Sequence, residues 1–303
     1  MNRQQWLEER RKGICGTDIS AILGLNPWKT AYDVWLEKTG RAKPSEENMA
    51  MKMGKLLEPI VAGLYEEETG KKLQDCELVV HPNYDFIRGT PDRMVCNEDL
   101  GLEIKTLRSF DASKSAGITW GEQYTDRIPQ HYFLQVIWYM LLTDKNAFDV
   151  AALAGGQDFR IYRVNRDQEL EKMLIDKAYE FWRKNVLENN PPEISENDDL
   201  SKIYNKITPG AIIATDEIAS ICYELARIDK VEKEAAAKKK ELKAIVQIFM
   251  KEKDELIDNS SGETLITWHG SEVSRLDHKR LKDSDIDISS YYNTKVERKF
   301  LIK

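Results

Sequence analysis

The sequence contains few of the residues that build soft metal centres or covalent cross-links. Its four cysteines and four histidines are scattered through 303 residues, with no C-x-x-C pair and no histidine pair at ligand spacing. This distribution excludes the usual zinc and iron–sulfur sites and predicts reduced thiols in a cytoplasmic protein. Any bound metal is therefore expected to be a hard cation held by oxygen ligands.

Long apolar runs and an excess of positive charge are also missing. No segment approaches the ~20 apolar residues of a membrane span, and the first residues show no signal-peptide pattern, so we expect no membrane association. The net charge of −7 does not fit a protein that coats nucleic acid electrostatically. A nucleic-acid role would need local basic surface, and the candidates for it are Arg88, Arg93, Arg108 and the cluster Arg10-Arg11-Lys12.

What the chain does contain is apolar material for a substantial core, since 41% of its residues are hydrophobic. The periodicity of these residues predicts a mixed α/β domain over residues 1–192. The predicted helices are 17–23, 30–39, 49–69, 128–143 and 167–187, and the predicted strands are 76–81, 85–95, 101–107, 147–153 and 158–164.

The remainder of the chain is predicted to be an extension. A polar linker covers 193–214, and residues 215–303 are expected to hold one long helix, 215–257, with short strands at 264–268 and 295–302. Apolar residues step along this helix at spacings of three and four, interrupted by the alanine- and lysine-rich stretch 234–240. The pattern favours an interrupted coiled coil or arm over a DNA-binding helix.

The most informative segment is Gly89-Thr90-Pro91-Asp92, followed by Glu103-Ile104-Lys105. Two apolar runs flank the turn-prone stretch 97–101, which predicts a hairpin that brings Asp92 and Glu103 together. Side chains alternate along a strand, so Glu103 and Lys105 share a face while Ile104 points into the core. Two carboxylates and an ammonium on one face suit a Mg²⁺ ion beside a water molecule. A surface ion-pair ladder across the strands is the alternative.

Glu58 is a further candidate for this site, upstream of the hairpin. Glu58 lies off the apolar stripe formed by Met53, Leu57, Ile60 and Leu64, so it is either a further metal ligand or a solvated side chain.

On the 128–143 helix, Tyr132, Gln135 and Tyr139 share one polar face, either toward the phosphates or water of a site or as an ordinary amphipathic surface. The turn Gly13–Thr17 precedes a helix N-terminus that favours an anion. Because Asp18 already places a charge there, simple N-capping by Thr17 is the expectation from the residues alone.

The order of these motifs resembles the YqaJ-type viral recombinases, which are phage and prophage exonucleases related to phage lambda exonuclease. The resemblance covers about residues 3–190. It is carried by the following segments: Gly13–Trp28, Ala31–Gly40, Met53–Glu58, Gly89–Asp92, Gly101–Lys105 and Ile128–Gln135.

The resemblance implies the PD-(D/E)xK nuclease fold, with a mixed central sheet flanked by helices. Asp92, Glu103, the Ile104 carbonyl and Glu58 would hold Mg²⁺ or Mn²⁺, and Lys105 would position or help deprotonate the attacking water. Gln135 and Tyr139 match the Gln-x-x-x-Tyr element of the family. Thr17 and Arg11 match positions that hold a 5′-phosphate, with Arg10 as the alternative to Arg11, and Tyr132 is a further candidate for DNA contact.

The function implied is a metal-dependent exonuclease of phage or prophage recombination in the cytoplasm of a bacterial host, which resects duplex ends 5′ to 3′ and leaves 3′ overhangs. The resemblance also implies a toroidal homotrimer, and a single-strand annealing protein is a possible partner of the extension. Two alternatives stay open, an endonuclease on the same fold and a non-catalytic adaptor that recruits such an annealing protein.

Overall fold

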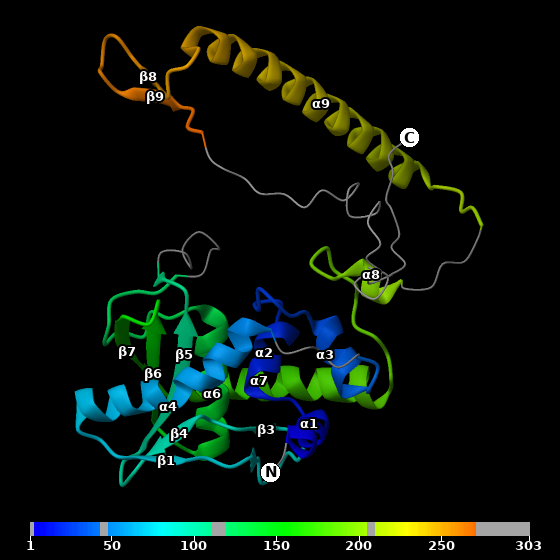
Figure 1. Ribbon diagram of the computed structural model, residues 1–303. Coiled ribbons are helices and arrows are strands. Elements are labelled where there is room, and N and C mark those ends of the chain that lie inside the picture. Colours follow the sequence, from blue (N-terminus) through cyan, green and yellow to red (C-terminus); the bar gives the residue numbers. More distant parts are fainter. Residues whose placement is uncertain (1–2, 43–47, 111–118, 205–209, 271–303) are drawn as a thin grey trace, which may run out of the picture. The chain divides into compact units, whose positions relative to one another are not determined.

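The computed structural model describes residues 3–42, 48–110, 119–204 and 210–270. The chain divides into two compact units, residues 1–198 and 199–303, which are treated separately below (Figure 1). The division falls inside the stretch 193–214 that the composition predicts as a linker.

A five-stranded mixed sheet forms the centre of the first unit. Its strands, in spatial order, are β1 (Leu73–Asp75), β4 (Arg93–Val95), β5 (Leu100–Leu107), β6 (Ala147–Ala154) and β7 (Asp158–Asn165). Only the β5–β6 pair is parallel, and the other neighbours are antiparallel. Seven of the eight residues of β6 are buried, as expected for an apolar strand covered on both faces. The predicted mixed α/β class is confirmed.

Helices cover both faces of this sheet (Figure 1). Helix α4 (Met49–Thr69) packs on one face, against β5 and β6, whereas α6 (Gln130–Thr143) packs on the other. Helices α2 (Gly16–Ile22) and α7 (Gln168–Phe181) pack against α6, and α7 continues as the π-helical turn η1 (Trp182–Leu187). Helix α3 (Ala31–Lys38) packs against α2 and η1. An additional helix α1 (Arg3–Arg11) and a small two-stranded sheet of β2 (Val79–Val80) and β3 (Arg88–Gly89) complete the unit.

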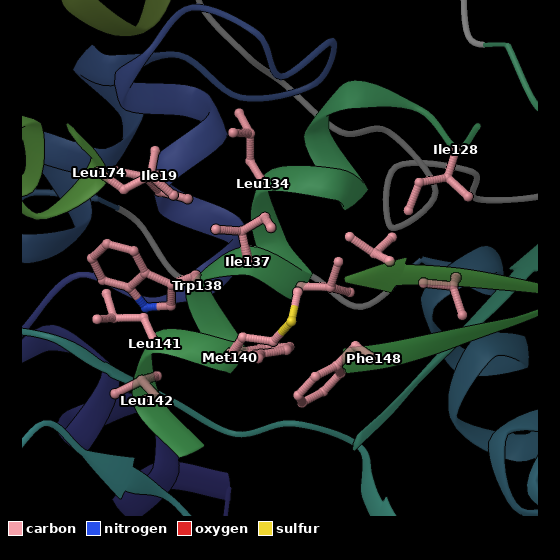
Figure 2. Close-up of a cluster of buried hydrophobic side chains, with 14 of the residues drawn as sticks. Ile19, Ile128, Leu134, Ile137, Trp138, Met140, Leu141, Leu142, Phe148 and Leu174 are labelled. Carbon is pink, nitrogen blue, oxygen red and sulfur yellow. The ribbon is translucent and has the colours of Figure 1, made fainter. Parts of the chain in front are cut away.

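Helix α6 is the centre of the larger hydrophobic core (Figure 2). Ten of its fourteen residues are buried, including Trp138, whose indole nitrogen donates to the Arg88 carbonyl at 3.1 Å. Gln135 and Tyr139 are among the ten, so these two do not belong to an ordinary amphipathic surface. They are polar groups inside a protein core and must be hydrogen-bonded there.

Three of the sequence expectations are wrong in detail. The predicted strand 76–81 is reduced to the two residues of β2, and β1 precedes it at Leu73–Asp75. The segment 85–95 is not one strand but two, β3 and β4, separated around Pro91, which has no N–H to donate to a sheet. The buried stripe of α4 is Val61, Ala62 and Tyr65, while Met53 and Ile60 are exposed. The apolar residues of α4 outnumber those that the sheet can cover, so spacing alone admits more than one stripe.

The second unit consists of α8 (Leu200–Ile203), the long helix α9 (Asp216–Met250) and a hairpin of β8 (Glu255–Ile257) and β9 (Thr264–Thr267). Thr215 caps α9, its hydroxyl accepting from the Ile218 N–H at 3.3 Å. The helix ends seven residues earlier than predicted, because Lys251 adopts a positive φ and 255–257 pair with β9. The predicted strand 295–302 lies outside the described residues. In the part of the chain that the structure covers, no helix is both long and apolar enough to cross a bilayer.

Candidate active site

The β4–β5 hairpin brings Asp92 and Glu103 face to face. Arg93 pairs with Leu102 and Met94 with Gly101, so Asp92, directly before β4, lies across from Glu103. The Oδ2 atom of Asp92 accepts a hydrogen bond from the Ile104 N–H at 2.7 Å, which links the segment 89–92 to the segment 103–105. The predicted hairpin is confirmed, together with the turn between its strands.

Glu103, Lys105 and Gln135 form a closed hydrogen-bonded triangle. Glu103 is 2% exposed, and its Oε1 accepts from Lys105 Nζ at 2.5 Å and from Gln135 Nε2 at 2.6 Å. Lys105 Nζ also donates to Gln135 Oε1 at 3.1 Å. The other carboxylate oxygen of Glu103 is buried and has no hydrogen-bond partner within the described part of the chain. A buried oxygen in this state is costly unless something else satisfies it.

The electrostatics of the site are those of two carboxylates sharing one cation. Burial and the neighbouring Glu103 raise the pKa of Asp92 to about 7. Burial lowers the pKa of the Lys105 ammonium, but Glu103 and Asp92 outweigh this effect and raise it. The site therefore carries an excess of negative charge beside a protonated lysine.

A pocket of about 210 Å³ opens onto these groups and is also lined by Glu58 from α4. Glu58 is half-buried there, and its Oε1 accepts from Arg93 Nη1 at 2.8 Å. Within the residues described, no three acidic, histidine or cysteine side chains come close enough together to hold a metal ion.

A hard cation nevertheless fits the donor set of this pocket. The unpartnered oxygen of Glu103, the raised pKa of Asp92 and the adjacent main chain of Ile104 all favour one. Such an ion would take two protein carboxylates here and keep several waters, as Mg²⁺ usually does.

Tyr139 holds Gln135 in place from the next turn of α6. Gln135 Nε2 donates its second proton to the Tyr139 hydroxyl at 3.0 Å. Burial, with Glu103 and Asp92 nearby, raises the pKa of Tyr139 well above its ordinary value, so this hydroxyl stays protonated. Its ring fits only because Gly16 and Gly89 have no side chain: a Cβ at either position would lie 2.9 Å from Tyr139 Cε1. Two glycines of the sequence motifs thus make room for one ring.

Tyr132 lies on the other side of Lys105, whose Nζ is 4.6 Å from the centre of the tyrosine ring. Such a contact stabilises the ammonium. Next to it, His131 is buried, and burial together with Lys105 lowers its pKa to about 4. The exposed ring of Trp28 packs edge-on against His131, with centroids 4.9 Å apart. His131 is thus a neutral packing residue, which its isolated position in the sequence did not reveal.

A second charged cluster surrounds the start of α2. Arg10 Nη2 donates to the Thr17 hydroxyl at 2.9 Å, whereas Arg11 is exposed. Among the described residues, Arg10 and not Arg11 forms a hydrogen bond with Thr17. The expectation that Thr17 caps the helix is wrong: the N-cap residue is Cys15, and its N–H donates to Asp18 at 3.0 Å.

Asp18 is the centre of this cluster and is completely buried. Its carboxylate lies 2.5 Å from Lys38 Nζ, 2.9 Å from Lys29 Nζ and 4.0 Å from Arg10. Burial alone would raise the pKa of Asp18, but the three cations hold it well below its ordinary value. Lys29 also pairs with Glu37 at 2.6 Å. Asp18 therefore does not oppose an anion at this helix end, because its charge is more than compensated.

The other basic candidates differ in availability. Arg88 is buried and pairs with Glu9 at 3.0 Å, and Arg93 pairs with Glu58 and with Asp75 at 3.1 Å. Arg108, just past β5, is exposed, with no ion pair to any described residue. Of the three arginines near the hairpin in sequence, Arg108 is the one with no ion pair among the residues that the structure describes.

Comparisons with known proteins bear on the family of this chain. The sequence model of the YqaJ-like viral recombinase domain matches residues 5–146. The uncharacterized protein YqaJ of Bacillus subtilis is 33% identical over 313 aligned residues, which cover 99% of this chain and 93% of that protein. The chain belongs to the YqaJ family. The resemblance seen in the sequence motifs is confirmed, and it extends through the long helix that the motifs do not cover.

More distant similarities add little to this assignment. Uncharacterized protein R354 of Acanthamoeba polyphaga mimivirus is 25% identical over 66% of this chain and 34% of its own length. Among solved structures, an alkaline exonuclease from Laribacter hongkongensis aligns with 59% of this chain and 91% of its own, at 17% identity and a TM-score of 0.45. A phage-related exonuclease from Haemophilus somnus aligns with 58% of this chain and 96% of its own, at 17% identity and a TM-score of 0.41.

Proposed function

We propose that this YqaJ-family protein is a metal-dependent DNA exonuclease with a PD-(D/E)xK site, which resects duplex ends 5′ to 3′ and leaves 3′ overhangs. The observation that carries the proposal is the pair Asp92 and Glu103, opposed across a hairpin beside a protonated Lys105. One Glu103 oxygen has no hydrogen-bond partner among the described residues and the pocket has surplus negative charge, as a site for a divalent cation requires.

Asp92 and Glu103, with the Ile104 carbonyl, would hold the Mg²⁺ or Mn²⁺ ion, and Glu58 would join them through water. When bound, such an ion neutralises charge on a phosphodiester and activates water. Lys105 places a fixed ammonium beside the carboxylates and can donate a hydrogen bond that orients the attacking water or stabilises charge on a phosphate oxygen. Gln135 orients both Glu103 and Lys105, and the Tyr139 hydroxyl fixes Gln135 in turn.

The proposed direction of digestion rests on the second charged cluster. Arg10 and Thr17 are in hydrogen-bond contact and belong to a cluster with three cations and two carboxylates, Asp18 and Glu37. A terminal 5′-phosphate carries the charge that this surplus favours. We assign that role to Arg10 and Thr17 rather than to Arg11, and propose that Tyr132 contacts the DNA strand beside Lys105.

The wider setting follows from the same proposal. A DNA substrate places the activity in the cytoplasm of a bacterial host, where a phage or prophage would encode it. Processive digestion would be supported by a toroidal homotrimer of the first unit, whose inward basic lining would reconcile DNA binding with the net charge of −7. The 3′ overhang would be handed to a single-strand annealing protein.

The decisive experiment digests a linear duplex labelled at one 5′ end, with and without its 5′-phosphate, in Mg²⁺ and in EDTA. We expect release of labelled mononucleotides in Mg²⁺ only, faster from the phosphorylated end. A covalently closed circle should stay intact. Cleavage of that circle would favour an endonuclease on the same fold.

The non-catalytic adaptor is tested by the same assay with Lys105→Ala. We expect the variant to lose digestion while it remains folded, with a lower thermal unfolding temperature, because Glu103 and Asp92 lose the cation that they share. Full digestion by the variant would remove the proposed site, and no digestion by the wild type under any divalent cation would favour the adaptor.

A further inference from the structure

Helix α9 carries an interrupted heptad repeat that the proposed nuclease site does not use. Taking Ile218 as the first a position, the a positions are Ile218, Leu225, Glu232, Lys239 and Val246, and the d positions are Ile221, Ile228, Ala235, Leu242 and Phe249. These ten residues are called the seam here. Seven of them are large and apolar, over five heptads, which is enough for a coiled coil.

The described residues of the second unit, 199–204 and 210–270, leave the seam largely uncovered. Six of its seven large apolar residues remain between 37% and 73% exposed, and Val246 is half-buried. A single helix of 35 residues, about 52 Å long, gains little stability in water when its apolar stripe stays solvated. A partner helix that covers the seam along its length would remove this cost.

The two charged residues at a positions decide which partner and orientation suit the seam. In a parallel pair of identical helices, each a position faces itself, so Glu232 would face Glu232 and Lys239 would face Lys239. In an antiparallel pair, a positions face d positions and both like-charge contacts disappear. Charge complementarity thus points to a second copy of this chain, running in the opposite direction.

One antiparallel register satisfies the whole seam. Placing Leu225 opposite Leu242 of the second copy also sets Ile218 opposite Phe249, Ile221 opposite Val246, Ile228 opposite Lys239 and Glu232 opposite Ala235. The helix then overlaps its partner over its full length. A shift by one heptad in either direction leaves apolar seam residues at one end without a partner.

The same register turns the charges into an attraction. Glu232 lies opposite the small Ala235, which leaves room for the acid, and Lys239 of the second copy is about one helical turn away, about 6 Å along the axis. The lysine stem can pack against Ile228 while its ammonium reaches Glu232. The pair occurs twice by symmetry. We propose that α9 is a homotypic antiparallel coiled-coil arm that joins two copies of this protein.

The first test measures the mass of the full-length protein by sedimentation velocity over a range of concentrations. Phe249→Asp should reduce the assembled species at least tenfold, since it places a charge in the seam. Ile248→Asp is the matched control, because Ile248 is the neighbouring residue and equally exposed, at 76% against 73%, but lies off the seam. Equal effects of the two substitutions would overturn the proposal. So would a Phe249→Asp variant with the same mass in solution as the wild type.

The second test reads the orientation from charge. Lys239→Glu should weaken assembly about tenfold, because two attractive pairs become repulsive, and Glu232→Lys should do the same. The double variant Glu232→Lys with Lys239→Glu should restore it. In a parallel pair the single variants merely exchange one like-charge contact for another. An unchanged mass in both single variants would therefore contradict the antiparallel arrangement.

The third test traps the register. In a Cys222→Ser background, Leu225→Cys together with Leu242→Cys should give a cross-linked dimer with a short bifunctional thiol reagent, whereas neither single variant should. Dimers from each single variant would indicate a parallel pair. Within one chain the two positions are about 25 Å apart, too far for the reagent.

These measurements separate the arm from the proposed nuclease. If the seam variants lose assembly but still digest DNA, the result supports the coiled-coil arm and does not bear on the nuclease. If they keep the wild-type mass and still digest DNA, the arm is refuted and the nuclease proposal is unaffected. If the first unit is itself trimeric, the seam variants would halve the mass of a hexamer rather than of a dimer. A seam that binds only an annealing protein would leave the wild type without self-association and would overturn the proposal.

Discussion

The first unit holds two buried charge clusters that are built in opposite ways. Around Asp18, three cations, Lys29, Lys38 and Arg10, surround one carboxylate, with Glu37 at the edge. At the hairpin, the two carboxylates of Asp92 and Glu103 share the single cation of Lys105. The pKa of Asp18 is accordingly held well below its ordinary value, while that of Asp92 is raised to about 7.

The comparison shows which charge each cluster leaves unpaired. The Asp18 cluster holds one positive charge more than it can pair within itself, which suits an anion such as a terminal phosphate. The hairpin cluster holds one negative charge more than it can pair, and one Glu103 oxygen has no partner in the described residues, which suits a cation. A buried acid therefore stabilises the fold at one site and costs stability at the other.

The largest effect is expected from Glu103→Gln. Digestion should fall at least about a thousandfold, because the pocket loses half of its charge for the cation. The metal-free protein should be as stable as the wild type or more so, since a repulsion is removed. Enzyme assays and thermal unfolding in EDTA test both parts. Glu67→Gln, an exposed acid on α4, is the control and should change neither.

Asp18→Asn is expected to have the opposite effect on stability. Three buried or partly buried cations would lose their shared partner, and the free energy of unfolding should fall by about 3 kcal/mol. For a unit of this size that lowers the unfolding temperature by about 10 °C.

The sign of the pH dependence of this effect follows from the lowered pKa. Asp18 contributes stability above the ordinary carboxyl pKa near 4, and this contribution is lost as the pH falls below it. The gap between wild type and variant should thus be full at pH 7 and should narrow only below about pH 4. A gap independent of pH would contradict this account, and Asp176→Asn on the exposed face of α7 serves as the control.

Gly16→Ala should damage both clusters at once, because Gly16 begins the helix of Asp18 and touches the side chains of the hairpin site. Its new methyl group would lie 2.9 Å from Tyr139 Cε1 and 3.0 Å from Gln135 Cγ. We expect a loss of about 2 kcal/mol in stability and about tenfold in digestion rate. Gly63→Ala in α4 meets no atom within 4 Å and should be neutral or slightly stabilising.

The smallest effect is expected from Arg10→Gln. The preference for 5′-phosphorylated over unphosphorylated ends should fall about tenfold, because the surplus charge of the Asp18 cluster disappears. Arg11→Gln changes the neighbouring, exposed arginine, which does not contact Thr17, and should leave the preference intact. A larger effect from Arg11 than from Arg10 would move the phosphate site.

The two clusters also differ in how far the sequence predicts them. The hairpin was predictable because its partners are close in sequence and a turn lies midway between them. The Asp18 cluster was not, since Lys29 and Lys38 reach Asp18 through the packing of α3 against α2, which no local pattern encodes. For the same reason, the fit of Tyr139 between Gly16 and Gly89 became visible only with the fold.

The periodicity of apolar residues predicted the extent of the helices better than it predicted which face of a helix is buried. It placed α4 correctly from 49 to 69, but it chose the wrong stripe, because the face that is buried depends on the sheet and not on the helix alone. It predicted α9 as an arm or interrupted coiled coil, and the structure gives a single helix with its seam exposed. The proposed partner of that seam is inferred from the charges of Glu232 and Lys239. In the apolar pattern these two positions are only an interruption.

The measurement that tests the central claim most directly is the binding of Mn²⁺ to the protein without DNA, followed by electron paramagnetic resonance. The wild type should bind Mn²⁺ at the hairpin site, Mg²⁺ should displace it, and Glu103→Gln and Asp92→Asn should each weaken binding at least about tenfold, while Glu67→Gln should not. Absence of binding, or binding of equal strength in Glu103→Gln, would contradict the assignment of Asp92 and Glu103 as a site for a divalent cation.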